Sequence, residues 1–496
     1  MVRIFVNIFI CFILIIISGF SEAEGQEKGK PFSRHYGPKD YKGGTQNWAV
    51  VEDNHGMIYI ANQQGVIQYD GAEWHAIPNK NKSTIRSLAL DDHGQIWVGA
   101  YGEMGFLAPE KNGTLTFQSI TSLVDKEHIN FAEVWNIQPA DSSIYLLTDN
   151  YLFRYRQHTL KAWTCKGEYF YTEMACRNHF IFQEIGGGLH AIINDSLVSV
   201  TGSDFFRQSR IHAFFDLGGD TVLIGTRSQG LFTAVVEIAG YKIHLRQLHS
   251  IEGEASEYFI KHSLYHGIKL LNGDMAFATI RGGVILIDKN FRIKEIYTSQ
   301  TAIGHEACYY LIQAKDKSLW VALDNGLAHI ELNSPFRYWD NESGYKGTIT
   351  DINRHNKTLY ISTASGVYYL DETAGTYISR FIQIPDFSQQ TWCLLKVNDL
   401  RYKGDSALLA STSENIFLIE NHRARSIYSN KSNYEIFRSP RNPRLLYAGT
   451  RNGLQVLEFK TGKYRLKSHI NGINYEVRAW PKTNQAIYGQ VSVIKE

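Results

Sequence analysis

The sequence contains few of the residues that would indicate a disulfide-stabilised fold, and it has no strong net charge that would indicate a charged binding partner. Its 496 residues include only 10 prolines and 5 cysteines, which excludes Pro-rich and disulfide-dense proteins. Lys plus Arg number 51 and Asp plus Glu number 49, so no strong net charge attracts nucleic acid or an anionic membrane. In contrast, 41 glycines accompany 29 Tyr, 26 Phe and 9 Trp. Glycine permits tight turns and aromatic residues favour strands, so the composition predicts short strands joined by tight turns.

Long apolar runs are also missing, except at the N-terminus. Arg3 precedes an apolar run over residues 4–17, and the small residues Ser21 and Ala23 follow it. This order is typical of a secretory signal peptide, so we expect cleavage after residue 23 and a periplasmic mature protein. The run is shorter than the roughly 20 residues of a membrane span; an uncleaved anchor is the alternative.

Four cysteines remain once residues 1–23 are removed. Cys165 and Cys176 are close enough in sequence to form a local disulfide, and two buried thiols are the alternative. Either way, four cysteines do not make a disulfide framework.

One structural unit repeats along the chain. Each copy has an apolar strand, an Asp/Asn/Gly turn, an apolar-aromatic strand, a short polar loop ending in glycine, and a third strand. The clearest copies carry these marker glycines: Gly65, Gly105, Gly230, Gly283, Gly326, Gly366 and Gly453. Most spacings are about 40–45 residues, which is typical of β-propeller blades. Helical repeats are disfavoured because the apolar residues alternate.

A longer duplication predicts the number of blades. Pro-Phe occurs at residues 31–32 and 335–336, and Tyr-Lys-Gly follows at 41–43 and 345–347. Gly65 and Gly366 are 301 residues apart, the length of seven blades of about 43 residues. The sequence therefore predicts an all-β fold: a seven-bladed propeller over residues 31–333, then a second, incomplete propeller of about four blades over residues 334–496.

Ring closure explains the duplicated segments. The last blade of the first ring lacks an outer strand, and residues 32–36 are available to supply it and remove an exposed edge. By the same reasoning, residues 336–339 close the second ring. We interpret the incomplete second ring as the front part of a longer protein or a truncated product; a genuine four-bladed propeller is the alternative.

The repeats resemble the two-component regulator propeller repeat family. Residues 91–99 (DDHGQIWVG) match its central pattern, residues 223–226 (LIGT) and 447–450 (YAGT) match the strand ending, and Gly65 and Gly366 begin its third strand. The resemblance implies the periplasmic sensor region of a Bacteroidetes-type hybrid two-component system. Such proteins carry two seven-bladed rings, a β-sandwich, a membrane helix, and a kinase or helix-turn-helix output. It also implies sensing of carbohydrate fragments; this chain shows no kinase motif.

Candidate ligand-binding residues lie in the loops between second and third strands, which share one face of a propeller. Arg227 and Arg281 come from neighbouring copies and could bind a carboxylate or sulfate. Tyr101 could stack on a sugar ring, and Asp324 is a further loop candidate. Ordinary solvated loop residues are the alternative. We expect Trp97 and Trp320 to pack between blades. No catalytic residue, metal site or cofactor is predicted.

The leading hypothesis is a periplasmic sensor region that binds a small ligand, in particular an oligosaccharide, and that could form a homodimer. It predicts no nucleic-acid partner, and contact with the membrane only through a missing C-terminal part or an uncleaved signal peptide.

A secreted polysaccharide lyase or glycoside hydrolase and a protein-binding scaffold are the alternatives. Two carboxylates or a Tyr/His pair within about 10 Å on one face would support an enzyme; an extensive apolar patch would support a scaffold.

Overall fold

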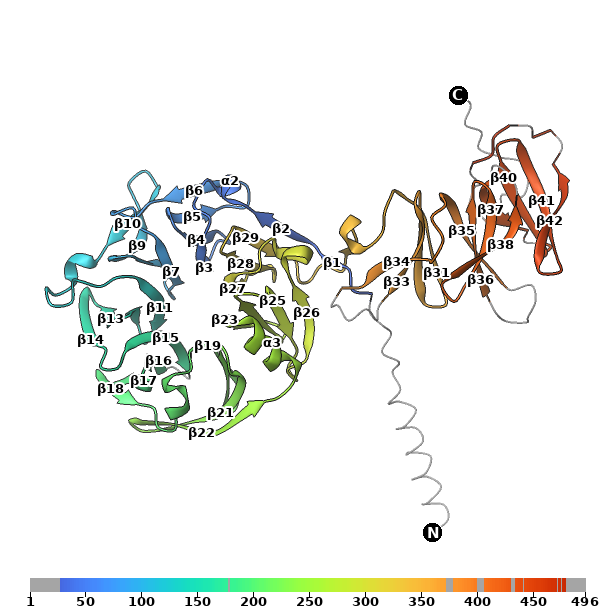
Figure 1. Cartoon of the computed structure of the whole chain (residues 1–496). Helices are drawn as coiled ribbons and strands as arrows, with labels where there is room; N and C mark the ends of the chain where they lie inside the picture. The colour runs from blue at the N-terminus through green and yellow to red at the C-terminus, as the bar shows by residue number, and fades with distance from the viewer. Residues whose placement is uncertain are drawn as a thin grey trace, which may run out of the picture. The chain divides into compact units, whose positions relative to one another are not determined.

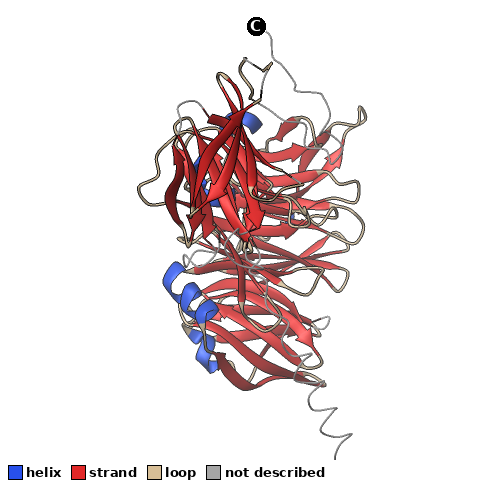
Figure 2. Cartoon of the chain, turned by 90° about the vertical axis from the view of Figure 1, so that its right-hand side faces the viewer, coloured by secondary structure: helices blue, strands red, loops and turns tan. Residues whose placement is uncertain are grey.

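The computed structural model of the chain describes residues 27–176, 179–371, 378–398, 406–429, 433–439, 441–470, 472–473 and 475–478. The predicted signal peptide, residues 1–23, lies outside the described residues. The chain divides into two compact units, one spanning Lys30–Arg337 and one containing Tyr338–Glu496 together with Met1–Gly29. Strands make up most of both units and helices are few (Figures 1 and 2). The predicted all-β class is therefore confirmed.

The unit Lys30–Arg337 is a ring of seven four-stranded antiparallel sheets (Figure 1). Six of these blades use consecutive strands: β3 (Asn47–Glu52), β4 (Ile58–Asn62), β5 (Gly65–Tyr69) and β6 (Trp74–Ile77); β7 (Ile85–Leu90), β8 (Ile96–Ala100), β9 (Glu103–Pro109) and β10 (Leu115–Ser119); β11 (Val134–Ala140), β12 (Ser143–Thr148), β13 (Tyr151–Arg156) and β14 (Thr159–Thr164); β15 (Tyr169–Cys176), β16 (His179–Ile185), β17 (Gly188–Ile193) and β18 (Ser196–Ser199); β19 (Ile211–Gly218), β20 (Thr221–Thr226), β21 (Gly230–Ala239) and β22 (Lys242–Ile251); β23 (Leu264–Lys269), β24 (Met275–Thr279), β25 (Val284–Ile287) and β26 (Ile293–Tyr297). The first strand of each blade is the innermost in the ring.

The seventh blade joins the two ends of the ring. It contains β27 (Cys308–Gln313), β28 (Leu319–Leu323) and β29 (Leu327–Ile330), and its outer strand is β2 (Ser33–Tyr36). Ser33 pairs with Ile330, and Tyr36 pairs with Leu327. The prediction that residues 32–36 close the first ring is confirmed.

The second unit contains three four-stranded blades among its described residues. They are β31 (Ile349–His355), β32 (Thr358–Thr363), β33 (Gly366–Asp371) and β34 (Arg380–Gln383); β35 (Thr391–Asn398), β36 (Ser406–Thr412), β37 (Asn415–Glu420) and β38 (Arg423–Ser429); β39 (Asn433–Arg438), β40 (Leu445–Thr450), β41 (Gly453–Lys460) and β42 (Lys463–His469). The strands predicted after residue 475 lie mostly outside the described residues. Strand β30 (Arg337–Tyr338) joins none of these blades, so closure of a second ring by residues 336–339 stays a prediction.

Short elements connect the blades. They are β1 (Lys30–Pro31), α2 (Pro38–Tyr41), η1 (Thr121–Leu123), η2 (Asp204–Arg207), α3 (Glu254–His262), η3 (Ser299–Ile303) and η4 (Asn341–Ser343). No helix within the described part of the chain combines the length and apolarity needed to cross a membrane.

The Asp-x-x-Gly turns explain why the first and second strands of a blade pair. The Asp91 carboxylate accepts backbone N–H groups of His93 and Gln95, both at 2.9 Å, and Gly94 adopts a φ of 81°. An aspartate that satisfies turn amides and a glycine at positive φ favour a tight reversal. The same carboxylate accepts the Trp97 indole N–H at 2.9 Å, which fixes that ring beside the turn.

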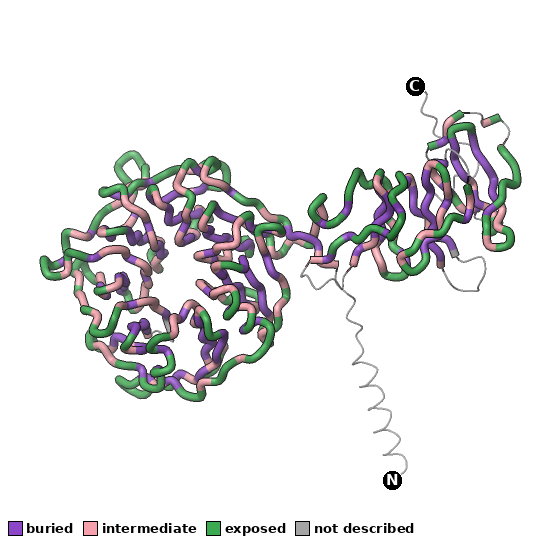
Figure 3. The backbone as a smooth tube through the Cα atoms, viewed as in Figure 1, coloured by how far each residue is buried: buried purple, intermediate pink, exposed green. Residues whose placement is uncertain are grey.

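The core lies between neighbouring blades (Figure 3). Burial is densest in the second strands, and β4, β8 and β28 are buried at every residue. Trp97 packs with Val134 and Ile144 of the next blade, and it is only 5% exposed. Trp320 is likewise 5% exposed and packs with Tyr36 and Tyr69. Both tryptophans therefore pack between blades, as the sequence predicts.

Candidate functional site

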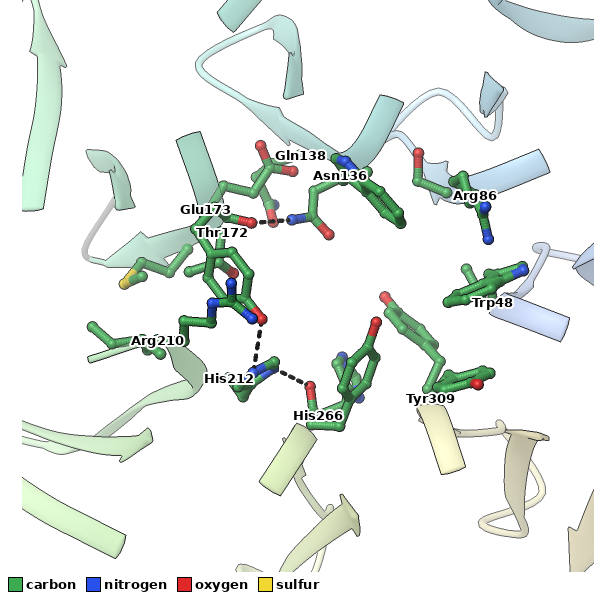
Figure 4. Close-up of a pocket in the computed structure, with 18 of the residues that line it drawn as sticks. Trp48, Arg86, Asn136, Gln138, Thr172, Glu173, Arg210, His212, His266 and Tyr309 are labelled. Atoms are coloured by element: carbon green, nitrogen blue, oxygen red, sulfur yellow. Dashed lines mark hydrogen bonds between the residues drawn. The ribbon is translucent and has the colours of Figure 1, made fainter. Parts of the chain in front are cut away.

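A cavity of about 910 Å³ occupies the centre of the seven-bladed unit. Its wall includes residues from all seven inner strands, β3, β7, β11, β15, β19, β23 and β27. Figure 4 shows side chains from around the ring pointing toward this shared space. Its volume falls within the range of small-molecule sites.

A β-bulge in every inner strand places one side chain in the cavity wall. In each blade the pairing of the first strand with the second skips one residue near the start of the strand. We call these seven positions the bulge residues: Trp48, Arg86, Trp135, Tyr171, His212, Tyr265 and Tyr309. A bulge inserts one residue and redirects its side chain, so all seven line the cavity.

On one side of the cavity the bulge residues form an aromatic cluster around a guanidinium. Trp48 stacks on Tyr309 with ring centroids 4.5 Å apart and planes at 3°. The Arg86 Cζ atom lies 4.1 Å from the Trp48 ring centroid and 5.1 Å from that of Trp135. Arg86 also makes an ion pair with Glu133 at 3.0 Å. Such stacking holds flat apolar surfaces rigidly in place.

On the other side the bulge residues form a hydrogen-bonded pair. The His212 Nδ1 atom lies 2.6 Å from the Tyr265 carbonyl oxygen, and Nε2 lies 2.9 Å from the Tyr171 hydroxyl. A carbonyl only accepts, so Nδ1 carries the proton and Nε2 accepts from Tyr171. Burial lowers the pKa of His212 to about 3 and raises the pKa of Tyr171. Both groups are therefore neutral at physiological pH.

Two arginines stand next to this pair. Arg210 precedes β19, and its Nη2 donates to the Tyr169 hydroxyl at 2.7 Å. Arg227 lies in the β20–β21 loop, and its backbone N–H donates to the Arg210 carbonyl at 3.0 Å. Both side chains line the cavity.

The cavity also holds two carboxyl groups. Burial raises the pKa of Glu173 well above its ordinary value, and its Oε2 has no hydrogen-bond partner in the described structure. Asp149 accepts the Trp135 indole N–H at 3.0 Å, and burial raises its pKa as well. Glu173 is labelled in Figure 4 among the residues around the open space.

The four residues proposed from sequence occupy different places. Arg227 is half-buried in the cavity wall. Asp324 accepts hydrogen bonds from the Tyr309 hydroxyl at 2.8 Å and from the Gln46 amide at 2.7 Å. It therefore orients the bulge residue Tyr309.

Tyr101 and Arg281 lie outside the cavity wall. Tyr101 is 54% exposed at the β8–β9 turn. Arg281 is exposed, and its Nη2 donates to Ser263 Oγ at 3.0 Å. The structure therefore does not bring the Arg227 and Arg281 side chains together in this site.

The possible disulfide partner of Cys165, the side chain of Cys176, lies outside the described residues. Cys165 is a free thiol whose Sγ donates to Glu184 Oε1 at 3.1 Å. Among the residues that the structure describes, no group of three His, Cys, Asp or Glu side chains could hold a metal ion.

Comparison with known proteins agrees with this architecture. No family model matches the sequence, and no curated protein matches it. Among solved structures, the chain is similar to the extracellular domain of a hybrid two-component system from B. thetaiotaomicron, with 15% identity and a TM-score of 0.65. The match covers 89% of this chain and 61% of that domain, so the chain spans less than two thirds of its length.

Two further solved structures are less similar. A second such domain from B. thetaiotaomicron has 14% identity, a TM-score of 0.46, and coverage of 89% and 61% of the two chains. A streptogramin B lyase has 14% identity and a TM-score of 0.46, covering 61% of this chain and 98% of the lyase. The first match shows that the chain has the propeller fold of that extracellular domain.

Proposed function

We propose that this chain is a periplasmic ligand-binding sensor region of a two-component signalling protein, and that its ligand is an oligosaccharide bound in the central cavity. The observation that carries the proposal is the convergence of seven bulge residues, one from each blade, on one cavity. The pairing of the first two strands skips these residues, so their side chains are not needed for the strand pairing of the blade.

The cavity wall has the chemistry that a sugar needs. Sugar rings present apolar faces that stack on aromatic rings, and their hydroxyls both donate and accept hydrogen bonds. Trp135 and Tyr309 provide aromatic surfaces, and Trp48 lies stacked between Tyr309 and the Arg86 guanidinium. Asn136 and Gln138 provide amides on strand β11 (Figure 4).

Binding at this position affects the whole ring. A ligand that contacts several inner strands at once favours the blade arrangement in which those contacts coexist, because it stabilises the state that it binds best. In a complete signalling protein this change in the ring would alter the domain that follows.

The test is calorimetric titration of the full chain, without residues 1–23, against neutral and acidic oligosaccharides. Trp48→Ala should weaken binding of an active oligosaccharide by about 10-fold or more, since it removes the ring on which Tyr309 and Arg86 pack and an aromatic hot spot contributes about 2 kcal/mol or more. Trp163→Ala is the matched control, because Trp163 lies on the outer strand β14. Failure of every oligosaccharide to bind, or unchanged affinity in Trp48→Ala, contradicts the proposal.

A second candidate function, β-elimination on an acidic polysaccharide, is favoured by the Tyr171–His212 pair. In that reaction a base removes the proton next to a carboxylate and the glycosidic oxygen leaves from the adjacent carbon, which gives an unsaturated sugar. The pKa shifts of both groups, however, oppose ionisation at neutral pH. We therefore favour sensing.

Incubation with uronate-containing polysaccharides separates the two functions. Sensing predicts binding without any rise in the ultraviolet absorbance of an unsaturated product. A rise that Tyr171→Phe abolishes would support the lyase instead.

A further inference from the structure

The charges around the cavity are not balanced. Arg86 is paired with Glu133 at 3.0 Å, so its charge is compensated inside the protein. Arg210 and Arg227 make no ion pair with any carboxylate among the described residues. Arg210 donates one N–H to the Tyr169 hydroxyl, and a guanidinium carries five N–H donors in all.

The other titratable groups of the wall do not supply the missing negative charge. His212 and His266 are neutral because burial lowers their pKa values to about 3 and about 4. Burial favours the protonated, uncharged form of Glu173. Asp149 is already engaged by the Trp135 indole. Two half-buried guanidiniums therefore face the cavity opposite at most one carboxylate.

These two arginines are held on the same blade. Arg210 directly precedes β19, Arg227 follows β20, and the hydrogen bond between their backbones fixes the two chain segments side by side. Arg210 Cζ also lies 5.0 Å from the Tyr171 ring centroid. The Arg210 side chain and the Arg227 backbone are thus fixed before any ligand arrives, which reduces the entropy lost on binding.

Guanidinium groups bind carboxylate and sulfate through paired N–H donors. A guanidinium that is partly buried and has no ion-pair partner loses hydration energy. A negatively charged group of the ligand would compensate for this loss. We propose that the oligosaccharide carries a carboxylate or sulfate group, and that Arg210 and Arg227 bind this group while the sugar ring contacts the aromatic cluster of Trp48, Trp135 and Tyr309. The inference rests on the proposed oligosaccharide-binding function and specifies its substrate class.

The experiment compares three probes of equal length by calorimetry: galactose oligomers, galacturonic acid oligomers and sulfated galactose oligomers. We expect an acidic probe to bind at least about 10-fold more tightly than the neutral one, and higher salt to reduce that difference. The carboxylate and sulfate arms then identify which anion the site prefers.

Single substitutions assign the preference to residues. Arg210→Gln and Arg227→Gln should each weaken binding of the acidic probe by roughly 10- to 100-fold, the cost of losing a hydrogen bond to a charged group. Binding of the neutral probe should change little. Arg210→Lys keeps the charge and should lose less. Arg281→Gln is the matched control, because Arg281 is exposed and outside the cavity wall.

The outcomes separate this inference from the function on which it rests. If the neutral probe binds as tightly as the acidic probes, and Trp48→Ala weakens that binding, the sensor proposal stands and the acidic-ligand inference is wrong. The inference is also wrong if acidic probes bind tightly but neither Arg210→Gln nor Arg227→Gln weakens them. If no probe binds, both proposals are overturned.

Discussion

The bulge residues occupy equivalent positions in seven blades but differ in chemistry. Tryptophan, arginine, tyrosine and histidine all occur there. A bulge fixes where the side chain begins without restricting its type, because the extra residue makes no regular ladder pair. Substitution of a single bulge residue can therefore change ligand specificity with little effect on the stability of the blades.

Glu173 gives a prediction at this scale. Its pKa is raised in the folded protein by burial, so the folded state holds a proton that the unfolded chain releases above its ordinary pKa of about 4.3. The contribution of Glu173 to stability is present below that pKa and decreases as pH rises. We expect Glu173→Gln, which removes the ionisation, to stabilise the protein at pH 8 relative to pH 5 by about 1 kcal/mol or more.

Chemical unfolding of wild type and Glu173→Gln at both pH values measures this difference. Glu331→Gln, on the surface after β29, is the control and should show no comparable pH dependence. If Glu173→Gln and Glu331→Gln change the pH dependence of the unfolding free energy equally, Glu173 is not held protonated in the folded protein.

The sequence predicts only part of the site at the residue scale. The sequence predicts Arg227 as a site residue because the repeat places it in the loop between the second and third strands of its blade, and it lines the cavity. Trp48 and Tyr309 are missed, since a one-residue change in register decides which side chain of a strand faces the channel. A signal exists nonetheless: the bulge residue is the second residue of six inner strands, as in Trp135 and Tyr265, and the third of β15, and it is large in an otherwise apolar repeat.

At the scale of the element, the marker glycines explain why the repeat is visible at all. Gly65 adopts a φ of 132°, and a Cβ atom there would lie 2.7 Å from the Ile77 carbonyl oxygen. Gly366, the equivalent residue one ring later, has a φ of 135°, and its Cβ would meet the Phe387 carbonyl. The third strand starts where the chain leaving the fourth strand passes, so only glycine fits.

We expect Gly65→Ala to destabilise the protein by about 2–4 kcal/mol, because backbone strain and a clash with main-chain atoms add together. Gly71 also has positive φ, 97°, but a Cβ atom there would meet nothing within 4 Å. Gly71→Ala should therefore cost only about 1–2 kcal/mol. Equal loss of stability in both variants, measured by urea unfolding, would contradict the close-approach explanation.

At the scale of the whole molecule, ring closure depends on a few residues near the N-terminus. Tyr36 at the end of β2 is 5% exposed and stacks on Trp320 with ring centroids 5.7 Å apart and planes at 11°. Together with the β2–β29 pairing, this contact joins the start of the unit to its last blade. The sequence predicts this closure because the seventh blade visibly lacks a strand.

Tyr36→Ala should destabilise the seven-bladed unit by about 3–5 kcal/mol, as for other large aromatic residues removed from a core. Phe32→Ala is the matched control, since Phe32 is 43% exposed and its loss should change stability by no more than about 0.5 kcal/mol. Thermal unfolding measures both variants. A small effect of Tyr36→Ala would mean that the other contacts of the seventh blade suffice to hold the ring closed.

The partner of β2 sets an order of events during biosynthesis. Ser33 is synthesised almost 300 residues before Ile330, with which it pairs. The early strand must wait unpaired while the intervening blades assemble, because the entropic cost of such a long loop is repaid only at the end. An open ring with two unpaired strand edges therefore exists until the seventh blade is complete. Chaperone binding in this interval would protect the protein from aggregation.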